Sequence, residues 1–200
     1  MGKTLTNLEK GIPVDFSYIA GDFSGNTSDA VAFYYEPPAC LRLLEPDLDE
    51  NNRFIPDASL MRQASALSNT DRIITEQQAV MPAIYGPEPA HGWCYYFQKA
   101  DLARQMNDWD EVVKLGDQAF KLDDYPNNPM ERFVFIEGYA HTEDWDRAVD
   151  LSKTSYKVSK EYVGPLLCQL WKRIEAETGE SPGRSEALAN IHAMIDCTLQ

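Results

Sequence analysis

The nine residues NDWDEVVKL (residues 107–115) return 36 positions later, with changes, as EDWDRAVDL (residues 143–151). Each copy places a tryptophan between two aspartates, immediately ahead of an apolar pattern that is typical of a helix. Each copy also follows a segment with helical spacing of its apolar residues. A duplicated turn and helix start at this period is typical of stacked helical hairpins, which bury their apolar faces only against one another.

The repeat predicts about six helices after residue 92, with connections short enough to make neighbouring helices antiparallel. Asp108 is placed to cap one helix, with Glu111 three residues on as the second half of a capping box. Asn128 precedes Pro129 at the start of the next helix. The predicted helices span residues 93–106, 109–122, 129–141, 145–157, 160–177 and 183–197.

The N-terminal part predicts a small sheet. Residues 14–19 alternate weakly and residues 30–35 are mostly aromatic or β-branched, so both indicate strands. Residues 21–29 are rich in glycine, asparagine and serine, which indicates a long loop between them. Residues 40–44 indicate a third strand, and residues 58–68 a short helix.

These elements predict an α+β fold that is mostly α, with a small N-terminal β-containing region packed on the helical array. Proline and glycine interrupt the chain five times between positions 82 and 92, so we place a linker there. The predicted parts are a small α+β region (residues 1–81), a linker (residues 82–92) and a helical-hairpin array (residues 93–200).

The charge of the chain narrows the classes of partner. Lys and Arg total 18 against 32 Asp and Glu, for a net charge of −14. Phosphate backbones and anionic lipids would repel such a surface, so we expect no nucleic-acid partner. The longest wholly apolar run, residues 30–35, is far short of the roughly 20 residues that span a bilayer, so we expect no direct membrane insertion.

Chemical motifs are sparse. The chain has no C-x-x-C, P-loop, G-x-G-x-x-G or G-x-S-x-G, and its three histidines are scattered. Asp47, Asp49 and Asn51 have the spacing of a calcium loop, but Asn52 stands where that loop needs glycine, so we expect a polar surface turn here. We therefore expect no catalytic residue, no cofactor and no metal site. For the four cysteines the residues favour buried thiols, and disulfides are the other alternative.

Residues 93–156 resemble two tetratricopeptide repeats, a family of helix-turn-helix units with small residues at close helix crossings. The positions that match are Ala100, Val112, Ala119 and Leu122 in the first unit, Tyr139, Ala148 and Leu151 in the second, and Trp109 and Trp145 at the turns. The chain departs from the family at Lys99, Arg132 and Ser155. The 36-residue repeat of Asp-Trp-Asp leads us to expect Trp109 and Trp145 to be structurally equivalent, each buried where its helix pair turns.

The resemblance implies a partner that is a protein or a peptide, bound along the first helices of the hairpins. The implied binding residues are Phe97, Asp101, Arg104, Gln105, Met130, Phe133, Glu137 and His141, with Cys94 and Ala140 beside them. Phe97, Met130 and Phe133 would supply apolar contact, and Arg104 would contact an anion. The alternative is that residues 13–75 fold over this groove and make it core.

A second, looser resemblance joins residues 37–44 to residues 93–105. Together they resemble the soluble C-terminal region of multi-spanning bacterial membrane proteins of glycosyltransferase-like type. This would make the chain an accessory domain beside a membrane, with the rest of a parent protein as its partner. Cys40 and Cys94 lie one in each segment, so we hypothesise a disulfide between them and, with it, an extracytoplasmic location.

Overall fold

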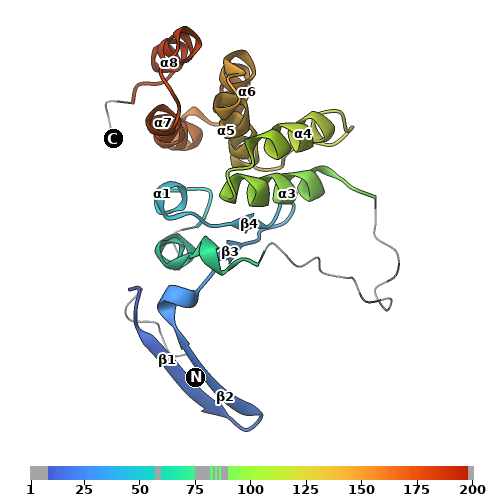
Figure 1. The fold of residues 1–200 in the computed structure, drawn as a ribbon, viewed down its shortest axis with the longest axis vertical. Coiled ribbons are helices and arrows are strands. Elements are labelled where there is room, and N and C mark those ends of the chain that lie inside the picture. Colours follow the sequence, from blue (N-terminus) through green and yellow to red (C-terminus); the bar gives the residue numbers. More distant parts are fainter. Residues whose placement is uncertain are drawn as a thin grey trace. The chain divides into compact units, whose positions relative to one another are not determined.

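The computed structural model describes residues 9–56, 60–74 and 90–197, together with residues 82, 84 and 86. Their fold is mostly α with a small N-terminal β region, as predicted (Figure 1). The chain divides into two compact units: residues 1–34 with 43–90, and residues 35–42 with 91–200. The second unit begins close to the predicted boundary, but it also takes in residues 35–42, which the sequence placed in the N-terminal part.

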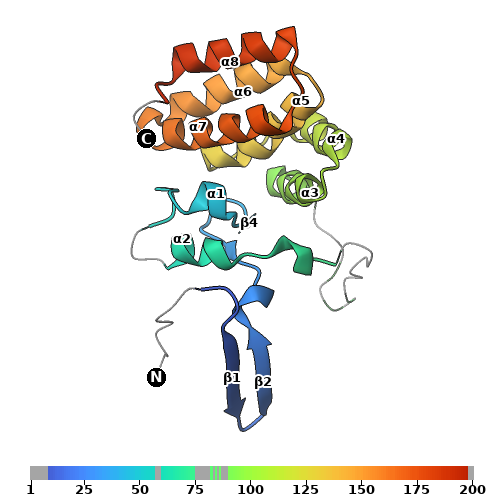
Figure 2. The same cartoon turned by 60° about the vertical axis from the view of Figure 1, so that its left-hand side comes forward.

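The helical unit consists of three hairpins, each made of a first and a second helix. Within it α5, α6, α7 and α8 run side by side (Figure 2), and every hairpin is in contact with the next. The helices are α3 (Trp93–Gln105), α4 (Trp109–Ala119), α5 (Phe133–His141, after a 3₁₀ turn Pro129–Arg132), α6 (Trp145–Val158), α7 (Lys160–Glu177) and α8 (Pro182–Met194). These bounds confirm the predicted helices to within four residues, and the largest difference is the start of α5, where Pro129–Arg132 is a 3₁₀ turn.

The turns of the first two hairpins repeat in detail. Asn107 and Glu143 have φ of 57° and 62°, the left-handed conformation that ends a helix. The amides of Asp108 and Asp144 each donate to the carbonyl five residues earlier, at 2.9 and 2.8 Å. Each aspartate then caps the following helix through its side chain, as predicted for Asp108. The carboxylate of Glu111 pairs instead with Lys114 at 2.6 Å.

The two turn tryptophans have different surroundings, although each reaches the next hairpin. The indole of Trp109 stacks on His141 with centroids 3.8 Å apart. Trp145 lies against Gly183, where an added Cβ would come within 2.6 Å of the indole. Both tryptophans are only half-buried, so the expectation of full burial is wrong. Each therefore contributes less than the roughly 3 to 5 kcal/mol of a fully buried aromatic side chain.

A disulfide fastens residues 35–42 to the first helix of the helical unit. Cys40 is bonded to Cys94 with 5.2 Å between Cα atoms, which confirms the hypothesis from the sequence. Beside it, Glu131 is fully buried and accepts hydrogen bonds from the Cys40 amide at 2.9 Å and the Trp93 indole at 2.8 Å. One carboxylate thus holds three segments of the unit together.

The buried carboxyl of Glu131 also links folding to pH. Burial raises the pKa of Glu131, and the hydrogen bonds from Cys40 and Trp93 oppose that rise. The folded chain consequently holds this proton more tightly than the unfolded chain does. The contribution of protonated Glu131 to the free energy of unfolding is therefore complete below the ordinary pKa of a glutamate. It is lost as pH rises through the raised pKa of the folded chain.

A second disulfide joins Cys168 of α7 to Cys197 beyond α8, with 5.7 Å between Cα atoms. It ties the last hairpin to the segment that follows it. With both bridges formed, all four cysteines are paired, so the alternative of buried free thiols is wrong.

The N-terminal unit is built on short elements, and its strands differ from the predicted ones. β1 (Pro13–Tyr18) pairs antiparallel with β2 (Gly21–Asn26) across a two-residue turn, so the predicted loop at residues 21–29 is wrong. β3 (Phe33–Tyr34) and β4 (Arg42–Leu43) form a second two-stranded sheet in place of the predicted three-stranded one. Its helical elements are η1 (Thr27–Asp29), α1 (Pro46–Asp49), α2 (Met61–Ala64), η2 (Ser65–Leu67) and η3 (Thr70–Arg72).

The segment with calcium-loop spacing uses its oxygens internally. Asp49 accepts hydrogen bonds from the Glu45 amide and from the side-chain amide of Asn52, both at 2.9 Å. Asp49 and Asn52 are fully buried, so the prediction of a polar surface turn is wrong for this pair.

We predict that the two disulfides contribute comparably to stability. Replacing Cys40 and Cys94 by serine should lower the free energy of unfolding by about 4 kcal/mol, and the Cys168 and Cys197 pair by slightly less, because the bridges close loops of 54 and 29 residues. Urea unfolding of the double variants measures both losses. Peptide mapping without reductant should recover both pairs, and alkylated Cys40 or Cys94 in the native protein would contradict the pairing.

Candidate functional site

The apolar residues of the predicted groove lie inside the protein. Phe97, Met130 and Phe133 are 3%, 2% and 3% exposed. Side chains at this level of burial have no surface left for a peptide. The groove implied by the family resemblance therefore offers no apolar contact at these three positions.

The charged residues of the predicted groove form a row of ion pairs across the first helices. Arg104 contacts Asp101 at 2.8 Å within α3 and Glu137 of α5 at 3.7 Å. The other oxygen of Glu137 accepts a hydrogen bond from Nε of Arg173, on α7, at 2.6 Å. Glu137 is only 2% exposed, so a buried carboxylate joins all three hairpins.

The last two predicted residues lie at the ends of their helices. His141, stacked on Trp109, has Nε2 3.4 Å from a carboxylate oxygen of Glu177 at the end of α7. Burial lowers the pKa of His141, and the nearby Glu177 raises it in part. The Nε2 of Gln105 is buried, and none of the described residues hydrogen-bonds it.

The structure thus brings the predicted residues together, but inside the protein. They form a seam, by which we mean the row of buried contacts between the first helices of the three hairpins. Sequence reasoning missed Arg173 and Glu177, because α7 does not carry the repeated motif. The signal was present as spacing: Asp101, Glu137 and Arg173 are 36 residues apart, as are Gln105, His141 and Glu177. The first helix of the third hairpin therefore keeps the period of the repeat.

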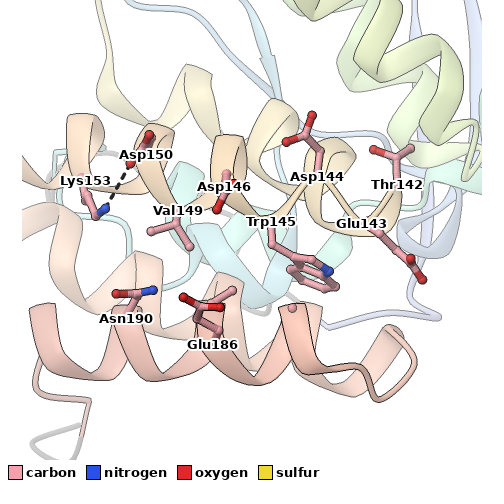
Figure 3. A pocket seen from close by; sticks show the side chains of 12 residues that line it. Thr142, Glu143, Asp144, Trp145, Asp146, Val149, Asp150, Lys153, Glu186 and Asn190 are labelled. Atoms are coloured by element: carbon pink, nitrogen blue, oxygen red, sulfur yellow. Dashed lines mark hydrogen bonds and ion pairs between the residues drawn. The ribbon is translucent and has the colours of Figure 1, made fainter.

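A pocket of about 580 Å³ lies between α6 and α8, the second helices of the last two hairpins (Figure 3). The Trp145 indole lies between the two helices at one end of this pocket, and Lys153 and Asn190 lie at the other. Gly183 is required beside the indole, since a larger residue would displace the ring. The lining residues are Thr142, Glu143, Asp144, Trp145, Asp146, Val149, Asp150, Lys153, Gly183, Glu186, Ala187 and Asn190.

This pocket carries an excess of negative charge, because it is lined by five carboxylates and a single lysine. Asp144 is already paired with Arg147 at 2.5 Å, and Asp150 with Lys153 at 3.0 Å. The three carboxylates that have no ion-pair partner among the described residues are Glu143, Asp146 and Glu186.

The acidic side chains lie along two helices and do not converge on a point. Among the residues that the structure describes, no three His, Cys, Asp or Glu side chains are grouped as metal ligands would be. The pocket can attract positive charge over its length, and the indole can contact a cation through its face. This chemistry is that of binding a cationic group.

A smaller pocket of about 370 Å³ lies between α4 and α6. The guanidinium of Arg147 sits 4.1 Å from the ring centre of Tyr139 there and bonds Asp117 at 2.6 Å. Burial raises the pKa of Tyr139 to about 12, so its phenol stays protonated at neutral pH. Arg147 thus joins α6 to α4 and helps to hold the first two hairpins together.

Comparison of the chain with protein-family models, with curated protein sequences and with solved structures gave no match. Of the helices that the structure describes, none combines the length and the hydropathy of a membrane-spanning segment.

We predict that Glu137 is worth far more to stability than an exposed glutamate in an ion pair. Glu137→Ala leaves Arg104 and Arg173 without their shared carboxylate, and such a loss should lower the free energy of unfolding by about 3 to 5 kcal/mol. The control is Glu111→Ala, which removes an exposed pair with Lys114 and should cost at most about 1 kcal/mol. Equal losses in chemical denaturation would show that the seam does not hold the hairpins together.

We predict that His141 makes the protein less stable in acid. Its pKa is lower in the folded than in the unfolded chain, so stability is full above the unfolded pKa, near 6.5, and falls as pH decreases below it. NMR titration of the ring should give a pKa below that value. His141→Gln should flatten the fall in unfolding free energy that occurs as pH decreases below about 6.5.

Proposed function

We propose that this chain is a non-catalytic protein- or peptide-interaction module, and that the pocket between α6 and α8 binds a positively charged segment of its partner. The observation that carries the proposal is a 580 Å³ pocket in which five carboxylates and an indole accompany one lysine. A lysine or arginine side chain matches it, because the long apolar stem lies against the ring while the charged end reaches the carboxylates.

The scaffold supports this use of the pocket. The three hairpins are joined by the Glu137 ion pairs and closed at one end by the Cys168–Cys197 bridge, so α6 and α8 are held in place before a partner arrives. A preorganised site loses little conformational entropy on binding. The net charge of −14 would also speed the approach of a cationic partner, most strongly at low ionic strength.

A second candidate function is that of an accessory domain of a larger bacterial membrane protein, with no independent binding activity. The burial of Phe97, Met130 and Phe133 favours it, because the surface that tetratricopeptide proteins offer to peptides is closed here. Two disulfides also fit an oxidising, extracytoplasmic compartment. Binding of free peptides at the α6–α8 pocket would favour the interaction module over this candidate.

Peptide titration tests the proposal. We expect lysine- and arginine-rich peptides of about ten residues to bind, with affinity falling as salt is raised, and glutamate-rich peptides of equal length not to bind. Asp146→Asn with Glu186→Gln should weaken binding by about 3- to 10-fold, the effect of losing two exposed charge contacts. Fluorescence anisotropy of labelled peptides at two salt concentrations measures the affinity of each peptide and its dependence on salt.

Asp110→Asn is the matched control for this titration. Asp110 occupies the first turn of α4 as Asp146 does that of α6, 36 residues later, but it lies outside the pocket. The affinity of the Asp110→Asn variant for basic peptides should stay within about 2-fold of the affinity of the unaltered chain. If basic peptides do not bind, or if Asp110→Asn weakens them as much as the pocket substitutions do, the pocket is not the binding site.

A further inference from the structure

The last hairpin departs from the first two on the face that lines the α6–α8 pocket. The second helix of each hairpin begins in the same way, because the side chains of Asp108, Asp144 and Ser181 each accept a hydrogen bond from the amide three residues on. The three second helices can therefore be aligned residue by residue from these caps. The second residue after the cap is Asp110, Asp146 and Gly183 in turn, and the fifth is Val113, Val149 and Glu186.

Both departures in α8 act on the space beside Trp145. Gly183 leaves that space open, since an added Cβ would come within 2.6 Å of the indole. Glu186 brings an exposed carboxylate to a position that is apolar in the other two second helices. The pocket is thus a feature of the last hairpin and not of the repeat.

The neighbouring pair of second helices, α4 and α6, already holds a cation that the chain itself supplies. The guanidinium of Arg147 lies 4.1 Å from the ring centre of Tyr139. It bonds Asp117 of α4 at 2.6 Å and Asp144, the cap of α6, at 2.5 Å. An aromatic ring and one carboxylate from each helix therefore hold a guanidinium between two second helices of this fold.

The α6–α8 pocket contains the same three parts without the cation. The indole of Trp145 supplies the ring, Asp146 the carboxylate of α6 and Glu186 the carboxylate of α8 (Figure 3). No arginine is among the described residues that line the pocket. We propose that an arginine side chain of the partner fills this place, so that the pocket selects arginine over lysine. The inference rests on the proposed function and specifies which cationic residue the partner presents.

The shape of the cation decides this preference. A guanidinium is planar and weakly hydrated, so it can stack on an indole while its fork of N–H donors reaches carboxylates on two sides. An ammonium is a compact, strongly hydrated charge without such a fork. The chain shows the same difference, because Lys114 and Lys153 pair with carboxylates of their own helices, whereas Arg147 crosses from α6 to α4. A pocket whose carboxylates come from two helices therefore favours the guanidinium.

Two peptides of about ten residues test the inference, one alternating serine with arginine and the other serine with lysine, so that their charges are equal. We expect the arginine peptide to bind the full chain about 3- to 10-fold more tightly, because it gains stacking and a second charged contact. Fluorescence anisotropy of the labelled peptides measures both dissociation constants.

Substitutions on and beside α8 test whether the guanidinium joins the two helices. Glu186→Gln should bring the two affinities within about 2-fold of each other, because the guanidinium then loses the carboxylate of α8. Glu180→Gln is the matched control, since it removes one exposed carboxylate just before α8 but outside the pocket. The arginine preference should be unchanged in Glu180→Gln.

The outcomes separate this inference from the proposed function. Equal binding of the two peptides, weakened equally by Asp146→Asn with Glu186→Gln, would leave the pocket as a cation site and overturn the selection of arginine. An arginine preference that survives Glu186→Gln would also overturn it, because the guanidinium would not join the two helices. If neither peptide binds, the proposed function fails and the inference fails with it. Far-UV circular dichroism of each variant confirms that folded chains are compared.

Discussion

The carboxylate of Glu137 is the point at which the three helical hairpins meet. It lies between Arg104 of the first hairpin and Arg173 of the third, and it is almost inaccessible to water. A buried charge is tolerated only when it is paired, so these helices can stack in one register alone. A slip by one turn of any first helix would leave a carboxylate or a guanidinium buried without its partner. The apolar side chains of the helices supply most of the driving force for stacking, and the ion pairs determine its register.

Residues 35–42 are joined to the helical unit by the same kind of constraint. Glu131 is buried with two donors, and one of them is the amide of Cys40. The disulfide to Cys94 then fixes that amide beside the carboxylate. The disulfide and the hydrogen bond to Glu131 thus act on the same short segment of chain.

Local patterns in the sequence predicted local structure well. The repeated Asp-Trp-Asp segment located two hairpin turns, and helical spacing located the helices. β2 was missed because Gly21, Ser24 and Gly25 are typical of loops, and only the pairing of Phe23 with Phe16 makes that segment a strand. The binding groove came from the family resemblance, which says nothing about burial. Burial depends on tertiary contacts, and so does the α6–α8 pocket, whose walls are about 40 residues apart in sequence.

The first and second helices of the hairpins use their acidic residues differently. Along the first helices, Asp101 and Glu137 meet Arg104 and Arg173, so this charge is largely balanced inside the protein. In the α6–α8 pocket, by contrast, three of the five carboxylates (Glu143, Asp146 and Glu186) have no ion-pair partner among the described residues. Balanced buried charge projects little field, whereas unbalanced charge at the surface attracts counter-ions and cationic chains. Under the proposed function, a positively charged partner would therefore be drawn to the second helices, whereas the resemblance to tetratricopeptide repeats points to the first.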